Sequence, residues 1–538
     1  MHKISGLIID PVNKKKFKGT ISVENGIISS VRETGEDIPE QVILPGFVDA
    51  HVHIESSMLV PSEFSRIALG HGTVATVSDP HEIANVCGVP GIDFMLENSR
   101  KVPLKFNFGV PSCVPATPFE TSGAELDAPT VAELLKRDDL SYLAEMMNWP
   151  GVLNADKEVL AKIKAALELG KPVDGHAPGL MGEEAERYIA AGISTDHECF
   201  RLEEAMDKLK YGMRIIIREG SAAKNFDELI PALNKYPGRI MFCSDDKHPD
   251  DLVKGHINDL VLRALNLDYD LMDTLEAASV TPVKHYRLDV GLLQKGDPAD
   301  FIVVRDLTRM RVLETWINGE RVYDGEKVDI PEIALPEINN FTPYTLEDKD
   351  FELPGKKEKF PIIEATEGSL ITKKTFLEPS IKNGNIQPDP SRDILKIAVV
   401  NRYKQARPAL DLVRGFGLKN GAIASSVAHD AHNIVAVGTS DHYLSRAVNM
   451  IMRSRGGISA AGPGQEDILP LPVAGIISDR PGEETAAAYK RLTRSAREMG
   501  SNLTAPHMLL SFMALEVIPS LKITDKGLFD VDKFEFIT

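Results

Sequence analysis

The sequence predicts an α/β fold: a (β/α)8 TIM-like barrel, with a small β-sandwich domain contributed by both flanks and an additional C-terminal α+β domain. Strand-like and helix-like segments alternate eight times between residues 47 and 245, which is what such a barrel requires. Strand-rich stretches with strong turn signals lie on both sides of this alternation. A doubly wound sheet would show the same alternation, so the polar residues at the strand ends must also be weighed.

The first flank, residues 3–33, is predicted to form short strands that turn at Asp10-Pro11 and at Asn25-Gly26. A similar stretch returns at 289–325, where glycines and the pair Asn318-Gly319 again mark turns. Neither stretch makes a domain alone. We therefore expect one small β-sandwich domain built from residues 1–44 and 289–335.

Residues 45–288 are predicted to form the barrel. Its candidate strands are 47–53, 73–78, 104–110, 140–146, 172–176, 193–197, 213–218 and 240–245. Candidate helices between them include 91–100, 155–169, 181–190, 201–210 and 225–235.

A connector rich in Pro, Glu and Lys follows at 336–360, and a C-terminal α+β domain is expected at 361–538. Its predicted strands are 397–401, 434–439 and 473–478, and its predicted helices lie near 440–453 and 483–499.

Composition limits the class of protein. The 538 residues are 43% hydrophobic and 26% charged, as in a soluble globular protein. The net charge of −18 argues against nucleic acid or an anionic membrane as the main partner. No signal peptide or membrane-spanning run is apparent, and the four scattered cysteines suggest neither a disulfide scaffold nor a thiolate zinc site. We expect a cytoplasmic protein.

The first barrel strand ends in His51-Val52-His53. Side chains alternate between the two faces of a strand, so His51 and His53 point the same way and can grip one metal ion. Alone, such a pair is more often a polar patch at a strand end.

Other out-of-place polar residues also follow strands. They occur within 78–82, at Glu145 inside an apolar run, and within 174–179, 195–198 and 243–246. Each has an ordinary explanation, such as an ion pair, a loop hydrogen bond or a helix cap. Together they are hard to explain without a shared ligand, because strand ends form the catalytic face of a barrel. Four imidazoles with two or three carboxylates suit one or two divalent ions of the Mn, Fe or Zn kind, which can generate hydroxide at neutral pH.

These motifs resemble the amidohydrolase superfamily, through PGFVDAHVH at 45–53, two later single histidines, the final Asp245 and the return GLLQKGDPADFIVV at 291–304. Further strings resemble the bacterial adenine deaminase family within it. They are HIESSM at 53–58, DPHEIANV at 79–86, AEMM at 144–147, IREGSAA at 217–223, SSVAHDAHN at 425–433 and EDILPLPVAG at 466–475. The resemblance spans nearly the whole chain.

The resemblance implies hydrolysis of adenine to hypoxanthine and ammonia in purine salvage, by attack on C6 of a hydroxide that bridges two metal ions. One ion, Mn or alternatively Fe or Zn, would be held by His51, His53 and Asp245. The other would be held by His176 and His197, with Glu145 bridging both. Asp245 would take the hydroxide proton and pass it to the leaving amine. Glu145 or Glu198 would protonate the ring, and the sequence does not choose between them.

Substrate contacts are expected from His81, Glu82, Glu198, His429 and Asp430. His81 and Glu82 could instead orient the metal ligands. The string that contains His429 and His432 could be a third metal site, a lid or a separate loop, and a lid is favoured because it would exclude water from a small base. Large barrels of this kind often self-associate, so we expect a homo-oligomer, a dimer.

Three rival functions were weighed against this interpretation. Another amidohydrolase reaction, such as cyclic amide hydrolysis or deacetylation, fits the metal cluster but not the C-terminal string. A non-enzymatic scaffold fits poorly because all candidate ligands are present. A nucleic-acid deaminase would need a His/Cys/Cys zinc signature, which is absent from the sequence.

Overall fold

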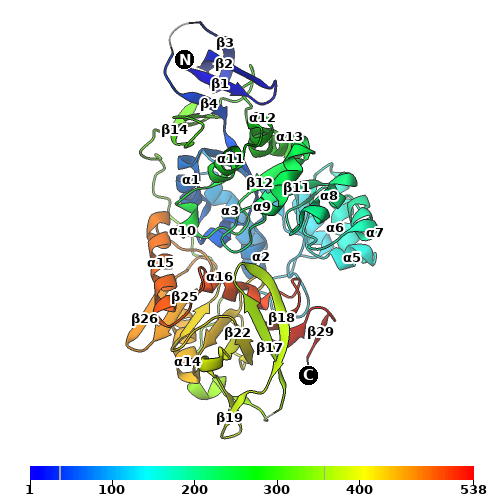
Figure 1. Ribbon diagram of the computed structural model, residues 1–538, viewed down its shortest axis with the longest axis vertical. Coiled ribbons are helices and arrows are strands. Elements are labelled where there is room, and N and C mark those ends of the chain that lie inside the picture. Colours follow the sequence, from blue (N-terminus) through cyan, green and yellow to red (C-terminus); the bar gives the residue numbers. More distant parts are fainter. Residues whose placement is uncertain (36–37, 357, 538) are drawn as a thin grey trace.

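The computed structural model describes residues 1–35, 38–356 and 358–537 (Figure 1). All eight predicted barrel strands are present, and neighbouring strands in each sheet are parallel. They are β5 (Phe47–Val52), β6 (Thr73–Ser78), β7 (Lys105–Val110), β8 (Leu140–Met146), β9 (Val173–Gly175), β10 (Thr195–Asp196), β11 (Arg214–Arg218) and β12 (Ile240–Cys243).

The strands curl so that the first and last meet. Strands β5 to β9 form one sheet and β10 to β12 another. Val52 and Asp245 form a parallel bridge between the two sheets, and the Asp245 amide donates to the His51 carbonyl at 3.0 Å. On the opposite side, the Ser194 amide donates to the Val173 carbonyl at 2.9 Å. This closure brings the ends of β5 and β12, with their predicted ligands, side by side.

Helices connect these strands and, from α10 onward, follow the last of them. They include α1 (Pro61–Gly70), α2 (His81–Cys87), α3 (Val89–Ser99), α4 (Ala128–Leu135), α5 (Trp149–Leu153), α6 (Lys157–Glu168), α7 (Gly182–Ala190), α8 (Leu202–Lys210), α10 (Pro249–Leu252), α11 (Ile257–Asn266), α12 (Leu271–Leu275) and α13 (Thr281–Tyr286). The single helix predicted at 225–235 is wrong. It divides into α9 (Phe226–Leu229) and a 3₁₀ turn over Ile230–Asn234, where Pro231 has no backbone N–H to donate.

Both flanks of the barrel join one seven-stranded sheet, ordered β15-β14-β13-β4-β1-β2-β3. The N-terminal strands are β1 (His2–Asp10), β2 (Lys15–Glu24), β3 (Ile27–Glu33) and β4 (Val42–Pro45). The returning strands are β13 (Phe301–Val304), β14 (Val312–Ile317) and β15 (Glu320–Tyr323). Strand β13 pairs with β4, so the two flanks are hydrogen-bonded to each other.

The C-terminal region is organised around an eight-stranded sheet, ordered β18-β17-β22-β21-β24-β23-β25-β26. Its strands are β17 (Phe360–Thr366), β18 (Ser369–Leu377), β21 (Leu395–Val400), β22 (Ala409–Arg414), β23 (Ala422–Ser425), β24 (Ile434–Gly438), β25 (Gly457–Gly462) and β26 (Gln465–Pro470). Smaller sheets contain β16 (Leu353–Pro354), β19 (Ser380–Lys382) and β20 (Asn385–Gln387), and also β27 (Leu521–Thr524), β28 (Gly527–Asp530) and β29 (Glu535–Phe536). The helices are α14 (Asp441–Ser454), α15 (Gly482–Glu498) and α16 (Pro506–Ser511).

The predicted strand at 473–478 is wrong. Val473 pairs only with Ile477, across a buried turn. Ala474 and Gly475 within that turn have positive φ angles of 52° and 68°, which an extended strand does not allow.

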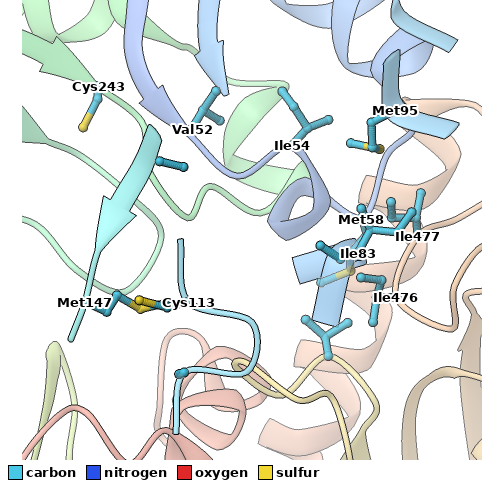
Figure 2. Packing of buried hydrophobic residues seen from close by; sticks show 14 of the residues in the cluster. Val52, Ile54, Met58, Ile83, Met95, Cys113, Met147, Cys243, Ile476 and Ile477 are labelled. Atoms are coloured by element: carbon cyan, nitrogen blue, oxygen red, sulfur yellow. The ribbon is translucent and has the colours of Figure 1, made fainter. Parts of the chain in front are cut away.

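The barrel lies between the N-terminal sheet and the C-terminal region, with α2 and α16 at the lower junction (Figure 1). Figure 2 shows Met58 and Ile83 of the barrel beside Ile476 and Ile477 of the C-terminal region, and all four belong to one buried hydrophobic cluster. The hydrophobic core is therefore continuous across this junction. Among the described residues, no helix combines the length and the apolar character needed to span a bilayer.

Candidate metal centre

His51 and His53 converge on Asp245 where β5 meets the end of β12 and the barrel closes. The two Nε2 atoms lie 3.1 Å apart, and Asp245 Oδ1 lies 3.6 Å and 3.4 Å from them. Ligand bonds of about 2.1 Å to one ion would leave neighbouring ligand atoms separated by roughly these distances. All three side chains are buried.

Glu145 reaches both halves of the cluster. Its Oε1 lies 3.4 Å from His53 Nε2, whereas its Oε2 lies 2.7 Å from His176 Nδ1 and 3.1 Å from His197 Nε2. Burial alone would raise the pKa of Glu145, but His176 and His197 hold it well below its ordinary value. The two oxygens therefore face two different groups of imidazoles, as a bridging carboxylate would.

The surrounding hydrogen bonds suit ligand roles. His53 Nδ1 lies 3.2 Å from the Asp79 carbonyl, and donation to that carbonyl leaves Nε2 unprotonated and free to bind a metal. The nitrogens that face the carboxylates are Nε2 of His51, His53 and His197 and Nδ1 of His176. This convergence of imidazole nitrogens and carboxylate oxygens fits a divalent ion of the Mn, Fe or Zn kind.

Arg218 was missed by the sequence analysis as a site residue. Its guanidinium is buried, donates to Asp245 Oδ2 at 2.7 Å, and holds both carboxylate oxygens of Glu198. Burial opposes ionisation of Asp245, but Arg218 and the nearby imidazoles keep its pKa well below the ordinary value. An arginine directly after Ile215-Ile216-Ile217 at a strand end was the available signal.

Asp79 and His81 lie beside the candidate metal ligands, closer than contact with a substrate alone would require. His81 Nδ1 is 3.1 Å from Asp79 Oδ2 and 3.6 Å from Glu145 Oε1. Together with His53 they form a buried group whose ligand atoms all lie within 4.8 Å of one another. The pair is therefore an additional candidate for holding or orienting a metal ion.

Glu82 is held by two histidines of the C-terminal region. His429 Nδ1 and His432 Nε2 each contact a different oxygen of its carboxylate. The Ala428 amide donates to His432 Nδ1 at 3.1 Å, so the ring proton of a neutral His432 resides on Nε2. His432 Nε2 and the Glu82 oxygen that it contacts do not have the geometry of a hydrogen bond. His81, Glu82 and Asp430 form a further buried group of candidate ligands, so a third metal site at this string stays a prediction.

One cavity collects these groups. Its barrel side is lined by the predicted ligands His53, Glu145, His176, His197 and Asp245, together with His81, Glu82, Glu198 and Asp246. Its C-terminal side is lined by Leu370, His429, Asp430, Phe512, Leu515 and Ile518. The Phe512 ring stacks on His429 with the ring centroids 4.4 Å apart. All residues predicted as substrate contacts thus reach the cavity wall, and a flat apolar surface faces the charged cluster.

Comparisons with protein families agree with the two-part construction of the cavity. Residues 42–322 match the family described as "Amidohydrolase family", and residues 369–535 match "Adenine deaminase C-terminal domain". A protein named adenine deaminase from Salinibacter ruber is 54% identical over 536 residues, which cover 99% of this chain and 98% of that protein. Similarly named proteins are 53% identical in a Sulfurovum species, over 98% of both chains, and 50% identical in Methanosarcina barkeri, over 100% of this chain and 99% of that protein.

Proposed function

Since the chain belongs to the amidohydrolase family, and within it to the adenine deaminases, we propose that it hydrolyses adenine to hypoxanthine and ammonia. The observation that carries the proposal is the shared cavity. Ligand-type groups from the barrel strands meet an apolar wall from the region that matches the adenine deaminase C-terminal domain. Hydrolysis needs the first part, and recognition of a planar base needs the second.

The finer architecture belongs to the same proposal. A (β/α)8 barrel over residues 45–288 would be joined by a β-sandwich domain from residues 1–44 and 289–335. A connector at 336–360 would lead to the C-terminal α+β domain. The cytoplasmic location and the homodimer stay predictions.

The metal ligands follow from the geometry above. His51, His53 and Asp245 would hold one divalent ion, and His176 and His197 would hold a second, with Glu145 between them. When bound, the ions would lower the pKa of a water molecule and so supply the nucleophile. Mn, Fe and Zn all suit this donor set.

Asp245 is the proposed proton carrier. Oδ1 faces the imidazoles of His51 and His53, while Oδ2 is fixed by Arg218. This fixed, ionised carboxylate can accept a proton from the attacking water and return it to the departing amine. Arg218 thus orients the base without touching the substrate.

Two acids, Glu145 and Glu198, line the cavity and are candidates to protonate the ring. Arg218 engages both oxygens of Glu198 and fixes its orientation, whereas His176 and His197 contact Glu145. Both acids stay candidates for this role.

The purine would lie between the charged cluster and the apolar wall. Phe512, Leu515 and Ile518 would cover a face of the ring, while His81, Glu82 and Asp430 would contact its polar edge. The position of His429 in the cavity wall supports the lid proposed for 429–432, and closure of that segment would exclude water.

Metal-dependent conversion of adenine tests the proposal. The purified protein is stripped with a chelator, supplied with Mn, Fe or Zn in turn, and assayed for hypoxanthine and ammonia. We expect activity to be lost on stripping and to return with metal. A protein that binds metal but converts no adenine would refute the proposed substrate and direct the search to cyclic amides.

A further inference from the structure

Three buried acids that interact electrostatically, Asp430, Glu516 and Glu120, lie where the C-terminal region meets the barrel. Asp430 lines the cavity that holds the metal cluster, and Glu120 lines an outer pocket beside Lys404 and Lys526. Glu516 interacts electrostatically with both Asp430 and Glu120. The exposed fractions of Asp430, Glu516 and Glu120 are only 2%, 0% and 6%.

Their carboxylate oxygens are left without partners. Among the described residues, Asp430 Oδ2, both Glu516 oxygens and Glu120 Oε1 are buried and make no hydrogen bond. Thr117 is near enough to lower the pKa of Glu516, but its hydroxyl does not have the geometry of a hydrogen bond. Four buried acceptors without partners are costly unless a group that donates hydrogen bonds binds to them.

The neighbouring cations are engaged elsewhere. Lys522 is fully buried, yet its ammonium group donates to the carbonyls of Leu370 and Phe512. Lys526 donates to the backbone carbonyls of Pro118 and Glu120. Neither lysine therefore makes an ion pair with the three acids.

The remaining acid nearby adds negative charge. Asp525 accepts from the Thr121 amide and hydroxyl and from the Asn401 side chain, so it is satisfied on its own. Burial, together with repulsion from Asp430 and Asp525, raises the pKa of Glu516 to about 8. Burial and repulsion from Glu516 likewise raise the pKa of Glu120 well above its ordinary value. A small cation between these groups would relieve both effects.

We propose that Asp430, Glu516 and Glu120 form a binding site for the ammonium product. Deamination breaks the bond between C6 and the amine, and the released ammonia takes up a proton to become ammonium. This cation has four N–H donors and matches a set of unpaired carboxylate acceptors. The inference rests on the proposed function, because that reaction supplies the ammonia inside the cavity.

Thallium(I) tests the site directly, because it is a monovalent cation that substitutes for ammonium and scatters X-rays anomalously. Crystals of the full-length, metal-loaded protein are soaked in thallium(I), and metal content is measured separately. We expect an anomalous peak between Glu516 and either Asp430 or Glu120. Excess ammonium should remove this peak.

The substitution Glu516→Gln removes the negative charge of this side chain and preserves its size and shape. Loss of a charged hydrogen bond predicts at least about tenfold weaker thallium binding. Asp411→Asn is the matched control, because Asp411 is also a buried acid of the C-terminal region whose pKa is raised to about 7 by burial. Crystals of Asp411→Asn should show the same anomalous thallium peak as the wild type.

No peak in the wild-type crystals, or an unchanged peak in Glu516→Gln, would overturn the inference. The result is separable from the proposed function. Normal adenine turnover without thallium binding would refute only the ammonium site, and thallium binding without adenine turnover would refute only the deamination.

Discussion

The barrel and the C-terminal region build the two walls of one cavity in different ways. The barrel presents its polar groups at the ends of strands, as with His51 and Asp245 where the barrel closes. The C-terminal region presents His429 and Asp430 from the connection between β23 and β24, and Phe512 from the end of α16. The candidate metal ligands of the barrel thus lie at or next to strand ends, whereas the cavity residues of the C-terminal region lie mostly on connections.

This difference implies that metal binding and substrate recognition are separable. Arg218 and the Asp79 carbonyl, which orient the ligands, belong to the barrel. Glu82 is the principal exception, because this barrel residue is fixed by His429 and His432. Substitutions in the barrel wall should affect metal content or chemistry, whereas those in the other wall should affect substrate use.

The largest effect is expected for Asp245→Asn. The amide cannot accept the proton of the attacking water, so kcat should fall by at least about 10³-fold. Much of the metal should remain bound because the imidazoles are unchanged. Steady-state kinetics and elemental analysis check both points, and near-normal turnover would remove Asp245 from its role.

His432→Ala tests the contact between the two walls of the cavity at Glu82. Without the imidazole of His432, Glu82 loses one of its two supports, and such supporting contacts are worth about 10- to 100-fold in activity. Metal content at the barrel cluster should stay at the wild-type value. His442→Ala is the control, because His442 is an exposed histidine on α14. Equal activity of the two variants would contradict the support of Glu82 by His432.

Phe512→Ala should alter recognition more than chemistry. Loss of the stacked ring is expected to raise KM for adenine about tenfold, with a smaller change in kcat. Phe512→Leu keeps much of the apolar volume, so its KM should lie between those of the wild type and Phe512→Ala. A fall in kcat alone, with KM unchanged, would place Phe512 outside the substrate wall.

The smallest effect on activity is expected for Asp411→Asn, which tests stability within the C-terminal region. Burial raises the pKa of Asp411 from 3.8 to about 7, so the folded protein binds this proton more tightly than the unfolded chain does. Wild-type stability from this group is therefore lost as pH rises from about 4 to 7, by up to about 4 kcal/mol. The Tm of the variant relative to wild type should rise between pH 5 and pH 8. A difference in Tm that is independent of pH would contradict the shift.

The sequence predicted the site residues of the barrel better than those of the C-terminal region, and the reason is physical. Alternating strands and helices constrain where strand ends meet, so His51, Glu145 and Asp245 could be grouped without coordinates. The role of Arg218 depends on the pairing of β11 with β12, which brings its guanidinium to Asp245. The barrel order predicts that pairing, but the sequence does not predict that the Arg218 side chain reaches Asp245.

Contacts across the junction were harder to foresee. His429 and Asp430 were recognised through the family resemblance, but their contacts with Glu82 and His81 join positions far apart in the chain. The unpaired state of Glu516 also arises only when the regions meet. The errors at 225–235 and 473–478 have local causes, a proline in one case and two positive φ angles in the other.

Crystals of the manganese-loaded protein, measured at the manganese absorption edge, test the central claim most directly. We expect two anomalous peaks, one bounded by His51, His53 and Asp245 and the other by His176 and His197, with Glu145 between them. Both should lie in the cavity whose opposite wall contains Phe512. A single peak, or peaks that Glu145 does not contact, would contradict the bridged metal centre on which the proposed deamination depends.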